Sequence, residues 1–306
     1  MSLSETNDLS ETNDLSETES QSTTQQLGRR RIATAFGDIA YAETGSGSVA
    51  LFVHGVFLNA NLWRHQLAAL GDIRRCVAVD LLAHGASPCP PPGPFTLQTQ
   101  ADMVLALLDA LGADSADLVG NDTGGAITQL VAAKAPHRVR SLTLTNCDAH
   151  DNWPPPAFDP IREMATTGTL AAALPALATD PALARSSLAM GFEHPDDLPD
   201  EYLTGMFAPF TDPAKASALQ DYIAAMDSSV TVAIRDDLAR LQAPTLVVWG
   251  TADEFFDKSW ARWLEELIPG TVRRTELDGA KLFFPAERWQ EFNLELRWLW
   301  SGRFAR

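Results

Sequence analysis

The surroundings of Asp122 are those of a side chain held out for chemistry. It follows the apolar run of residues 116–119 and precedes Gly124 and Gly125, after which residues 126–134 have a helical pattern. This order predicts a strand, a sharp turn and a helix, and glycines allow the close packing of such a turn. The pattern matches a nucleophile elbow, G-x-Nuc-x-G, with an aspartate where serine is common. A carboxylate nucleophile or base is one interpretation, and an aspartate that only caps the following helix is the other.

Alternating strands and helices surround this turn. The expected strands are residues 31–42 (a hairpin), 49–53, 76–79, 116–119, 139–145, 244–250 and 272–277. Such alternation predicts an α/β fold with a doubly wound, mostly parallel sheet covered on both faces. Ligands of these sheets bind outside the carboxyl ends of the strands. Because Val56, Asp122 and Asn146 follow such ends, we expect them to converge.

Composition divides the chain into three parts. The acidic repeat LSETND opens the sequence, and we expect a disordered tail over residues 1–28. Strand patterns vanish in residues 154–235, where Ala- and Leu-rich helical stretches are broken by proline and glycine. We therefore expect a helical cap over these residues, inserted between the core segments 29–153 and 236–306.

Charge and composition exclude several classes of partner. The formal net charge of −17 would repel phosphates, so we expect neither nucleic acid nor a membrane surface as partner. Cys76, Cys89 and Cys147 lack metal-ligand spacing, which suits a reducing cytoplasm. No apolar run approaches the ~18 residues of a spanning helix, and we expect no secretory signal. Without a phosphate loop or dinucleotide fingerprint, we expect a small-molecule substrate and no cofactor; the oligomeric state stays open.

Several motifs occur together in one order along the chain. They are HGVFLNANLW after one strand, DLLAHGAS after the next, GNDTGG around Asp122, and WGTAD after a later strand, followed by a loop before the last helix. With the helical segment between them, they resemble the α/β-hydrolase superfamily over roughly residues 30–303. They resemble in particular its haloalkane dehalogenase and epoxide hydrolase branch, which carries aspartate at the elbow. The resemblance implies an α/β-hydrolase fold with a helical cap, and an enzyme of hydrolase type.

That resemblance also implies roles for individual residues. Asp122 matches the nucleophile, which forms an ester with a substrate carbon. The backbone N–H groups of Val56 and Thr123 match the oxyanion hole, which stabilises negative charge during ester hydrolysis. Asp253 matches the acid that orients the catalytic base. His54 matches the histidine of the HG motif, which we expect to be structural.

The catalytic histidine of the family has no counterpart in this chain. Lys281 takes its place in the loop of residues 278–285, and no histidine follows His194. Neutral imidazole accepts a proton from water, whereas a lysine beside Asp122 and Asp253 should stay protonated. We therefore expect slow hydrolysis of any ester intermediate, with Lys281 as the atypical third catalytic residue.

Five residues are candidates to contact the substrate: Phe57, Trp63, His150, Tyr202 and Tyr222. Epoxide hydrolases protonate the opening oxygen with two cap tyrosines, and the cap contains Tyr202 and Tyr222 without a matching motif. Both tyrosines also suit the apolar interior of the cap. His150 is either a replacement base or a surface histidine. Dehalogenases hold the halide with side-chain N–H groups, which Val56 and Thr123 lack, so haloalkane turnover is disfavoured.

Three functions remain open at this point. The first is a hydrolase that works through Asp122 with a non-standard base. The second is an isomerase, cyclase or lyase in which Asp122 is a general base and Lys281 helps to stabilise an anion. The third is a catalytically impaired binding protein. The elbow and Asp253 favour an enzyme, because a binding protein has little need of a strained turn.

Overall fold

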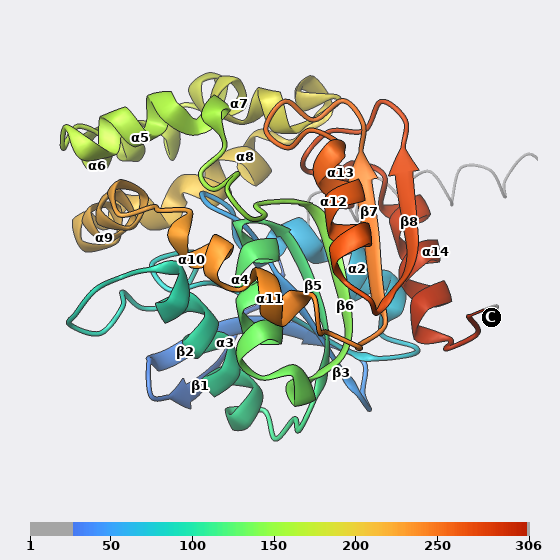
Figure 1. The fold of residues 1–306 in the computed structure, drawn as a ribbon. Coiled ribbons are helices and arrows are strands. Elements are labelled where there is room, and N and C mark those ends of the chain that lie inside the picture. Colours follow the sequence, from blue (N-terminus) through green and yellow to red (C-terminus); the bar gives the residue numbers. More distant parts are fainter. Residues whose placement is uncertain (1–26, 305–306) are drawn as a thin grey trace, which may run out of the picture.

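The computed structural model describes residues 27–304, so the expected tail lies outside these residues except for its last two. The described chain is built around one eight-stranded sheet. Its strands are β1 (Arg30–Thr34), β2 (Gly37–Thr44), β3 (Val49–Val53), β4 (Arg75–Val79), β5 (Ala116–Asp122), β6 (Val139–Cys147), β7 (Thr245–Gly250) and β8 (Thr271–Leu277). They lie in the order β1-β2-β4-β3-β5-β6-β7-β8 (Figure 1). Only the pairs that include β1 or β2 are antiparallel, which confirms the mostly parallel sheet.

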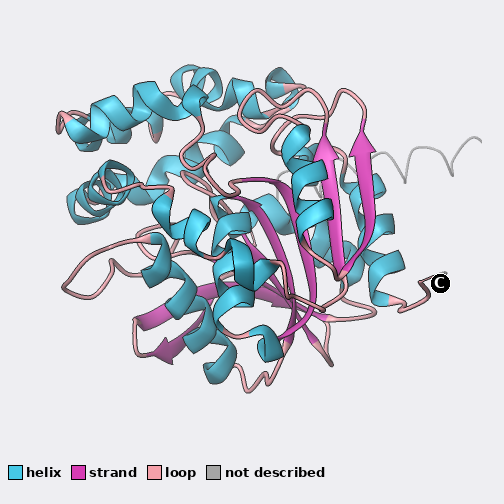
Figure 2. Ribbon diagram, in the orientation of Figure 1, coloured by secondary structure: helices cyan, strands magenta, loops and turns pink. Residues whose placement is uncertain are grey.

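The central strands are short apolar runs because helices cover both of their faces. Every residue of β3 and β7 is buried, as expected of a strand inside a doubly wound sheet. Figure 2 shows the helices on either side of the strands. α2 packs against α14, and α3 packs against α4. These core helices are α2 (Arg64–Leu70), α3 (Leu97–Ala110), α4 (Thr123–Lys134), α12 (Ser259–Leu267), α13 (Phe284–Glu287) and α14 (Trp289–Trp300).

Between β6 and β7 the chain forms helices and turns, which we call the helical insertion (residues 154–235). Its helices are α5 (Asp159–Thr166), α6 (Leu170–Leu177), α7 (Pro181–Leu188), α8 (Asp200–Phe207), α9 (Pro213–Ala224), α10 (Ser229–Ala233) and α11, whose span Arg235–Leu238 crosses its end. Aspartate followed by proline starts two of them, because Asp180 and Asp212 accept hydrogen bonds from the first-turn amides of α7 and α9. In Figure 1, α5 to α9 lie together above the sheet. The insertion therefore covers the edge at which β5 ends.

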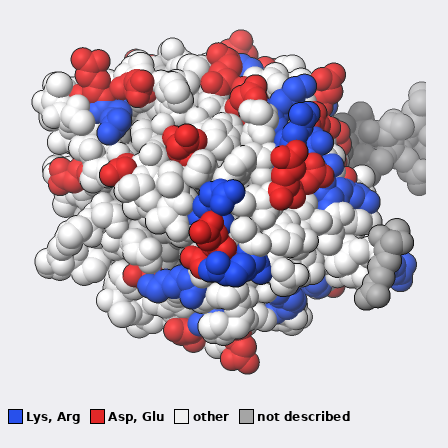
Figure 3. Space-filling model, in the orientation of Figure 1, with Lys and Arg blue, Asp and Glu red and all other residues white. Residues whose placement is uncertain are grey.

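The surface does not present one sign of charge on the face drawn in Figure 3. Lys and Arg side chains lie among Asp and Glu side chains there, and wide uncharged areas separate these groups. Within residues 27–304 no helix combines the length and the apolar character needed to cross a bilayer.

Candidate active site

The turn from β5 to α4 places Asp122 in an uncommon backbone conformation. Its φ of 55° and ψ of −135° put a residue with a Cβ in the left-handed half of the map, at a cost of about 1–3 kcal/mol. A Cβ at Gly124 would overlap the backbone carbonyl of Val53, so only glycine fits beside the strained residue. The Asp122 side chain makes no capping hydrogen bond to α4. The alternative interpretation as a helix cap is therefore wrong.

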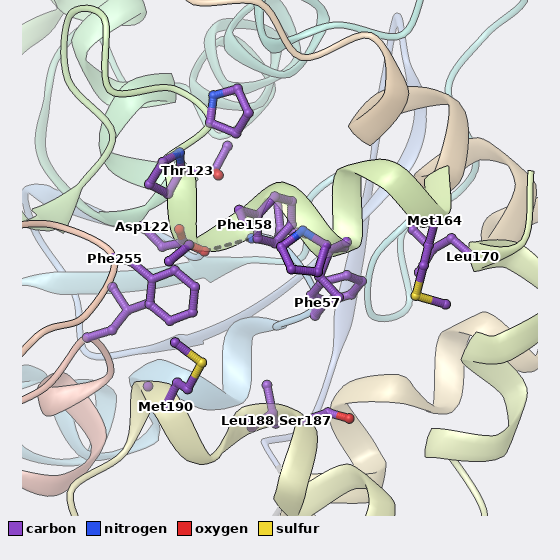
Figure 4. Close-up of a pocket in the computed structure, with 18 of the residues that line it drawn as sticks. Phe57, Asp122, Thr123, Phe158, Met164, Leu170, Ser187, Leu188, Met190 and Phe255 are labelled. Atoms are coloured by element: carbon purple, nitrogen blue, oxygen red, sulfur yellow. Dashed lines mark hydrogen bonds between the residues drawn. The ribbon is translucent and has the colours of Figure 1, made fainter. Parts of the chain in front are cut away.

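Backbone amides hold the Asp122 carboxylate. Its Oδ2 accepts a hydrogen bond of 3.1 Å from the N–H of Val56, the dashed line in Figure 4. The N–H of Thr123 also stabilises the ionised carboxylate. A Cβ at Gly55 would coincide with this carboxylate, so glycine before Val56 is what allows the loop to approach. The two amides expected to form an oxyanion hole thus contact the carboxylate of Asp122 itself.

Asp122 lies on the wall of a cavity of about 410 Å³. Figure 4 shows Asp122 and Phe255 near one end of this cavity and Met164 and Leu170 near the other. Leu183 and Met190 are 42% and 40% exposed and also contact the cavity, so they mark its mouth. Apart from Asp122, Thr123, Asp148 and Ser187, the lining side chains are apolar or aromatic, and most come from the helical insertion: Val56, Phe57, Trp153, Pro154, Pro155, Ala157, Phe158, Pro160, Ile161, Met164, Leu170, Ala173, Leu174, Leu177, Leu183, Leu188, Met190, Phe207, Met226, Phe255, Leu282 and Phe283.

The Asp253 carboxylate is already bound by groups of its own chain. Its Oδ2 accepts a hydrogen bond of 2.6 Å from Asn146 Nδ2, and its Oδ1 accepts one of 2.8 Å from the N–H of Phe255. Asn146 also exchanges two hydrogen bonds with the backbone of Gly250, which ties the end of β6 to the end of β7. Burial raises the pKa of Asp253 to about 6, against the effect of these donors. Asn146 therefore binds the Asp253 oxygen that, in an orienting acid, would accept a hydrogen bond from the catalytic base.

The position of Lys281 differs from the expectation that it lies beside Asp122 and Asp253. Its Nζ is 3.1 Å from Glu254 Oε1 in an ion pair that faces solvent, and its side chain does not line the cavity. Leu282 lines the cavity instead, and its backbone oxygen accepts a hydrogen bond of 2.9 Å from Asn121, next to Asp122. An ammonium group keeps its hydration at the surface, whereas an apolar cavity would strip it. The loop thus presents leucine to the cavity.

A further carboxylate, Asp148, lies on the cavity wall and was not among the candidates from the sequence. It directly follows β6, and its Oδ2 accepts a hydrogen bond of 2.9 Å from Thr123 Oγ1. The side chain is only 1% exposed, and its Oδ1 has no hydrogen-bond partner in the described residues. Val56, Asp122 and Asn146 became candidates because they follow strand ends. Asp148 also follows a strand end, so the same pattern could have predicted it.

Burial and mutual repulsion shift the titration of these carboxyl groups. Burial and the neighbouring Asp253 raise the pKa of Asp122 to about 7. Burial and the charge of Asp122 raise the pKa of Asp148 well above its usual value. Two carboxyl groups that line one apolar site do not both ionise easily, so one of the two tends to keep its proton.

His54 is structural, as expected. It is fully buried, its Nδ1–H donates to the carbonyl of Gly55 at 2.8 Å, and its Nε2 accepts from the N–H of Leu81 at 3.1 Å. Burial lowers its pKa to about 4, so the ring is neutral at physiological pH. Both ring nitrogens are occupied by the backbone of the loops beneath Val56.

Of the five candidate substrate contacts, only Phe57 lines the cavity. Trp63 packs in the core against Phe52 and Phe292, at ring-centroid distances of 5.3 and 6.4 Å. His150, Tyr202 and Tyr222 also pack against residues that do not line the cavity.

Their neighbours explain these positions. His150 stacks on Trp263 of α12 with ring centroids 5.0 Å apart. The Arg64 guanidinium covers the ring of Tyr202 at 4.2 Å. Tyr222 packs against a phenylalanine of the core side, Phe95, with centroids 4.8 Å apart.

Known proteins share this sequence pattern and this fold. The sequence model of the family described as alpha/beta hydrolase fold matches residues 50–286. The chain is 35% identical to a 2-hydroxymuconate semialdehyde hydrolase of a Pseudomonas species over 39% of its own length and 43% of that protein. It is 37% identical to a haloalkane dehalogenase of Agrobacterium fabrum over 39% of its length and 41% of that protein, and 35% identical to epoxide hydrolase 1 of Siraitia grosvenorii over 42% and 41%. The chain thus spans less than half the length of these relatives.

Solved structures extend the likeness over most of the chain. A meta-cleavage product hydrolase from Pseudomonas fluorescens superimposes with a TM-score of 0.76 at 19% identity, over 90% of this chain and 98% of that one. An epoxide hydrolase structure gives a TM-score of 0.76 at 19% identity, over 90% and 99%. At such identities the likeness concerns the fold alone. The family model covers most of the residues that form the sheet, and this chain belongs to the α/β-hydrolase fold family.

Proposed function

We propose that this protein is an enzyme of hydrolase type that attacks a small, uncharged and largely apolar organic molecule with the Asp122 carboxylate. One observation carries the proposal: a strained aspartate, held by backbone amides, lies on the wall of a cavity that is otherwise almost entirely apolar. Strain of this kind persists where the surrounding structure enforces it, and such places are often functional. A binding protein would have no need of it.

The hydrogen bonds of Asp122 suit the two steps of such a reaction. Since Oδ2 is held by the amide of Val56, attack on a substrate carbon falls to Oδ1. In the resulting ester, Oδ2 is the carbonyl oxygen and stays beside the amide of Val56. When water attacks the ester, negative charge develops on Oδ2, and donors already in place stabilise it.

The cavity limits the substrate. Its volume of about 410 Å³ is in the range of small-molecule sites, and its side chains offer few polar contacts. The carboxylates of Asp122, Asp148 and Asp253 would repel an anion. We propose that the helical insertion acts as a cap on the core of residues 29–153 and 236–306, excludes water and selects apolar molecules. Relatives named haloalkane dehalogenase and epoxide hydrolase support a substrate with an electrophilic carbon.

A second candidate is a non-hydrolytic reaction in which Asp122 removes a proton from the substrate. Leu282 lies on the cavity wall, and within residues 27–304 no Lys, Arg or His side chain lines the cavity. Without such a base to activate water, a non-hydrolytic reaction is favoured. The raised pKa of Asp122 also suits a general base near neutral pH. In this case the reaction is an isomerisation, cyclisation or elimination, and Lys281 takes no part since it pairs with Glu254.

Peptide mass spectrometry separates the two candidates. The full-length protein is incubated with a panel of apolar epoxides, alkyl halides and activated esters in heavy-oxygen water. A nucleophilic Asp122 gives a mass increase on its peptide, either the substrate as an ester or the heavy oxygen after turnover. Conversion of a substrate that Asp122→Asn abolishes, with neither change on the peptide, would establish the general base.

A further inference from the structure

Asp122 and Asp148 form a connected pair on the cavity wall. Both line the cavity, and the residue between them in space, Thr123, contributes its backbone N–H to Asp122 and its hydroxyl to Asp148. Asp148 is held by this bond through Oδ2 only. Its Oδ1 is buried and has no hydrogen-bond partner in the described residues, and Asp148 as a whole is only 1% exposed. A buried carboxyl oxygen without a partner costs free energy unless a ligand or water completes it.

The groups that face Asp148 give it no counter-charge. Asp122 and Asp253 are acidic, and Cys147 and Tyr222 are neutral groups whose pKa values are raised by burial and, after it, by the nearby carboxylates. The backbone carbonyl of Asp148 is engaged separately, by Gln129. In the absence of a cation, the pair is more stable with one carboxyl group protonated than with both ionised. One member is then a nucleophile while the other is an acid, as in other enzymes with paired carboxyl groups.

We propose that Asp148 is the proton-transfer partner of Asp122: it donates a proton to the oxygen of an epoxide substrate and then accepts a proton from the water that hydrolyses the ester. The inference rests on the proposed nucleophilic role of Asp122. It supplies the base that the chain lacks at the histidine position, where Leu282 lines the cavity. It also places the acid directly after β6 in the core, whereas Tyr202 and Tyr222 of the insertion do not line the cavity.

The protons balance through one cycle. Asp122 Oδ1 bonds to an epoxide carbon, the bond from that carbon to oxygen breaks, and the proton of Asp148 goes to the oxygen. The Asp148 carboxylate then takes a proton from water, whose oxygen bonds to Cγ of Asp122. The tetrahedral intermediate expels the alcohol oxygen, which receives the proton from Asp148. The products are a diol and a carboxyl pair that again holds one proton.

An epoxide is the substrate class that fits this proton balance. Opening an epoxide produces an oxygen that takes up the shared proton, so Asp148 becomes a base at the moment when a base is needed. A departing halide takes up no proton and would leave Asp148 protonated. Halide departure also lacks help here, because neither Val56 nor Thr123 has a side-chain N–H group.

The test uses Asp148→Asn in the full chain, with a panel of apolar epoxides and heavy-oxygen water. Asparagine can still accept the hydrogen bond of Thr123 but cannot transfer a proton. We expect epoxide opening to slow by about 100-fold or more, and the ester that does form to persist on the Asp122 peptide. The matched control is Asp151→Asn, the same substitution at an exposed position of the same loop, which should react as the wild type does. Thermal unfolding of both variants confirms that they are folded.

The outcomes separate this inference from the proposed function. If the wild type labels Asp122 with heavy oxygen but Asp148→Asn opens epoxides at the wild-type rate, the role of Asp148 is overturned and the nucleophile stands. If the wild type converts an epoxide without labelling Asp122, both are overturned. If it converts no epoxide but labels Asp122 with another electrophile, the epoxide assignment is overturned.

The pH dependence of epoxide opening by the wild type tests the same role without a variant that could misfold. Epoxide opening should slow as the pH rises and the pair loses its shared proton. The carboxyl groups that titrate near the reacting atoms are Asp122, Asp148 and Asp253. An opening rate that stays constant to high pH, well past the loss of this proton, contradicts Asp148 as donor.

Discussion

The two ends of β5 carry aspartates in opposite surroundings. At its start, Asp117 accepts hydrogen bonds from Arg74 at 2.7 Å, Arg140 at 3.0 Å and Ser141 at 2.7 Å. At its end, Asp122 has backbone amides, an apolar cavity and further carboxylates around it. Asp117, far from the cavity, is thus neutralised by two arginines, whereas Asp122, on the cavity wall, has no positively charged partner in the described residues. The difference indicates that the first stabilises the fold, whereas the second is retained at the expense of stability.

The largest expected effect is on catalysis. Asp122→Asn should lower turnover of any identified substrate by about 1,000-fold or more, because the amide is not a nucleophile or a base at neutral pH. Asp117→Asn should leave the rate per folded molecule within about twofold, since Asp117 lies at the opposite end of the strand. Steady-state kinetics on both variants measure this. Comparable losses in the two variants would remove the functional distinction between the ends.

The second effect is on the stability of the fold at pH 8, which Asp122→Asn should raise and Asp117→Asn should lower. The raised pKa of Asp122, about 7, means that between about pH 4 and 7 the folded protein binds a proton that the unfolded chain has released. Its contribution to stability is therefore full below about pH 4 and is lost as the pH rises through about 7. Asp122→Asn should raise the unfolding temperature at pH 8 and change it little at pH 4.

Asp117→Asn is the counterpart of that experiment. It should lower the free energy of unfolding by about 2 kcal/mol at pH 8, because it removes hydrogen bonds between charged groups and leaves two arginines unpaired. Thermal and urea unfolding of both variants measure the effects. A destabilised Asp122→Asn at pH 8 would show that Asp122 is compensated by groups other than those described.

The smallest effect concerns the loop that faces the cavity beside Asp122. Leu282→His should speed hydrolysis of an Asp122 ester by about tenfold, because it places imidazole on the cavity wall. Lys281→His should change it by less than about twofold, because that side chain points to Glu254 and an exposed ion pair contributes little. Decay of the ester, followed by peptide mass spectrometry, compares the variants. A larger gain from Lys281→His would mean that the loop adopts another arrangement.

The sequence predicted the features that depend on local pattern. The apolar runs, the glycines after Asp122 and the alternation of strand and helix located the strands, the elbow and the cavity edge to within a few residues. Such signals are local because glycine is required by backbone contacts and apolar runs by burial on two faces. The resemblance to a known family then assigned roles to residues in the loops.

The remaining features depend on which way side chains point. The resemblance to the family assigned Lys281 to the histidine position, but its neighbour Leu282 lines the cavity, a difference of one residue that only packing decides. Trp63, Tyr202 and Tyr222 are large aromatic residues that suit a protein core as well as a pocket, and the structure places them in the interior. Asp148 had the right position after a strand, but only the fold shows that Thr123 links it to Asp122.

The exposed methionine at the cavity mouth has a practical consequence. Met190 is accessible to oxidants, and oxidation would turn its thioether into a polar sulfoxide at the point where apolar molecules enter. A preparation aged in air would therefore bind such molecules more weakly while its fold and its carboxyl groups remained intact. Loss of activity on storage should be reversible by methionine sulfoxide reductase, and a reductant that acts only on thiols should not restore it.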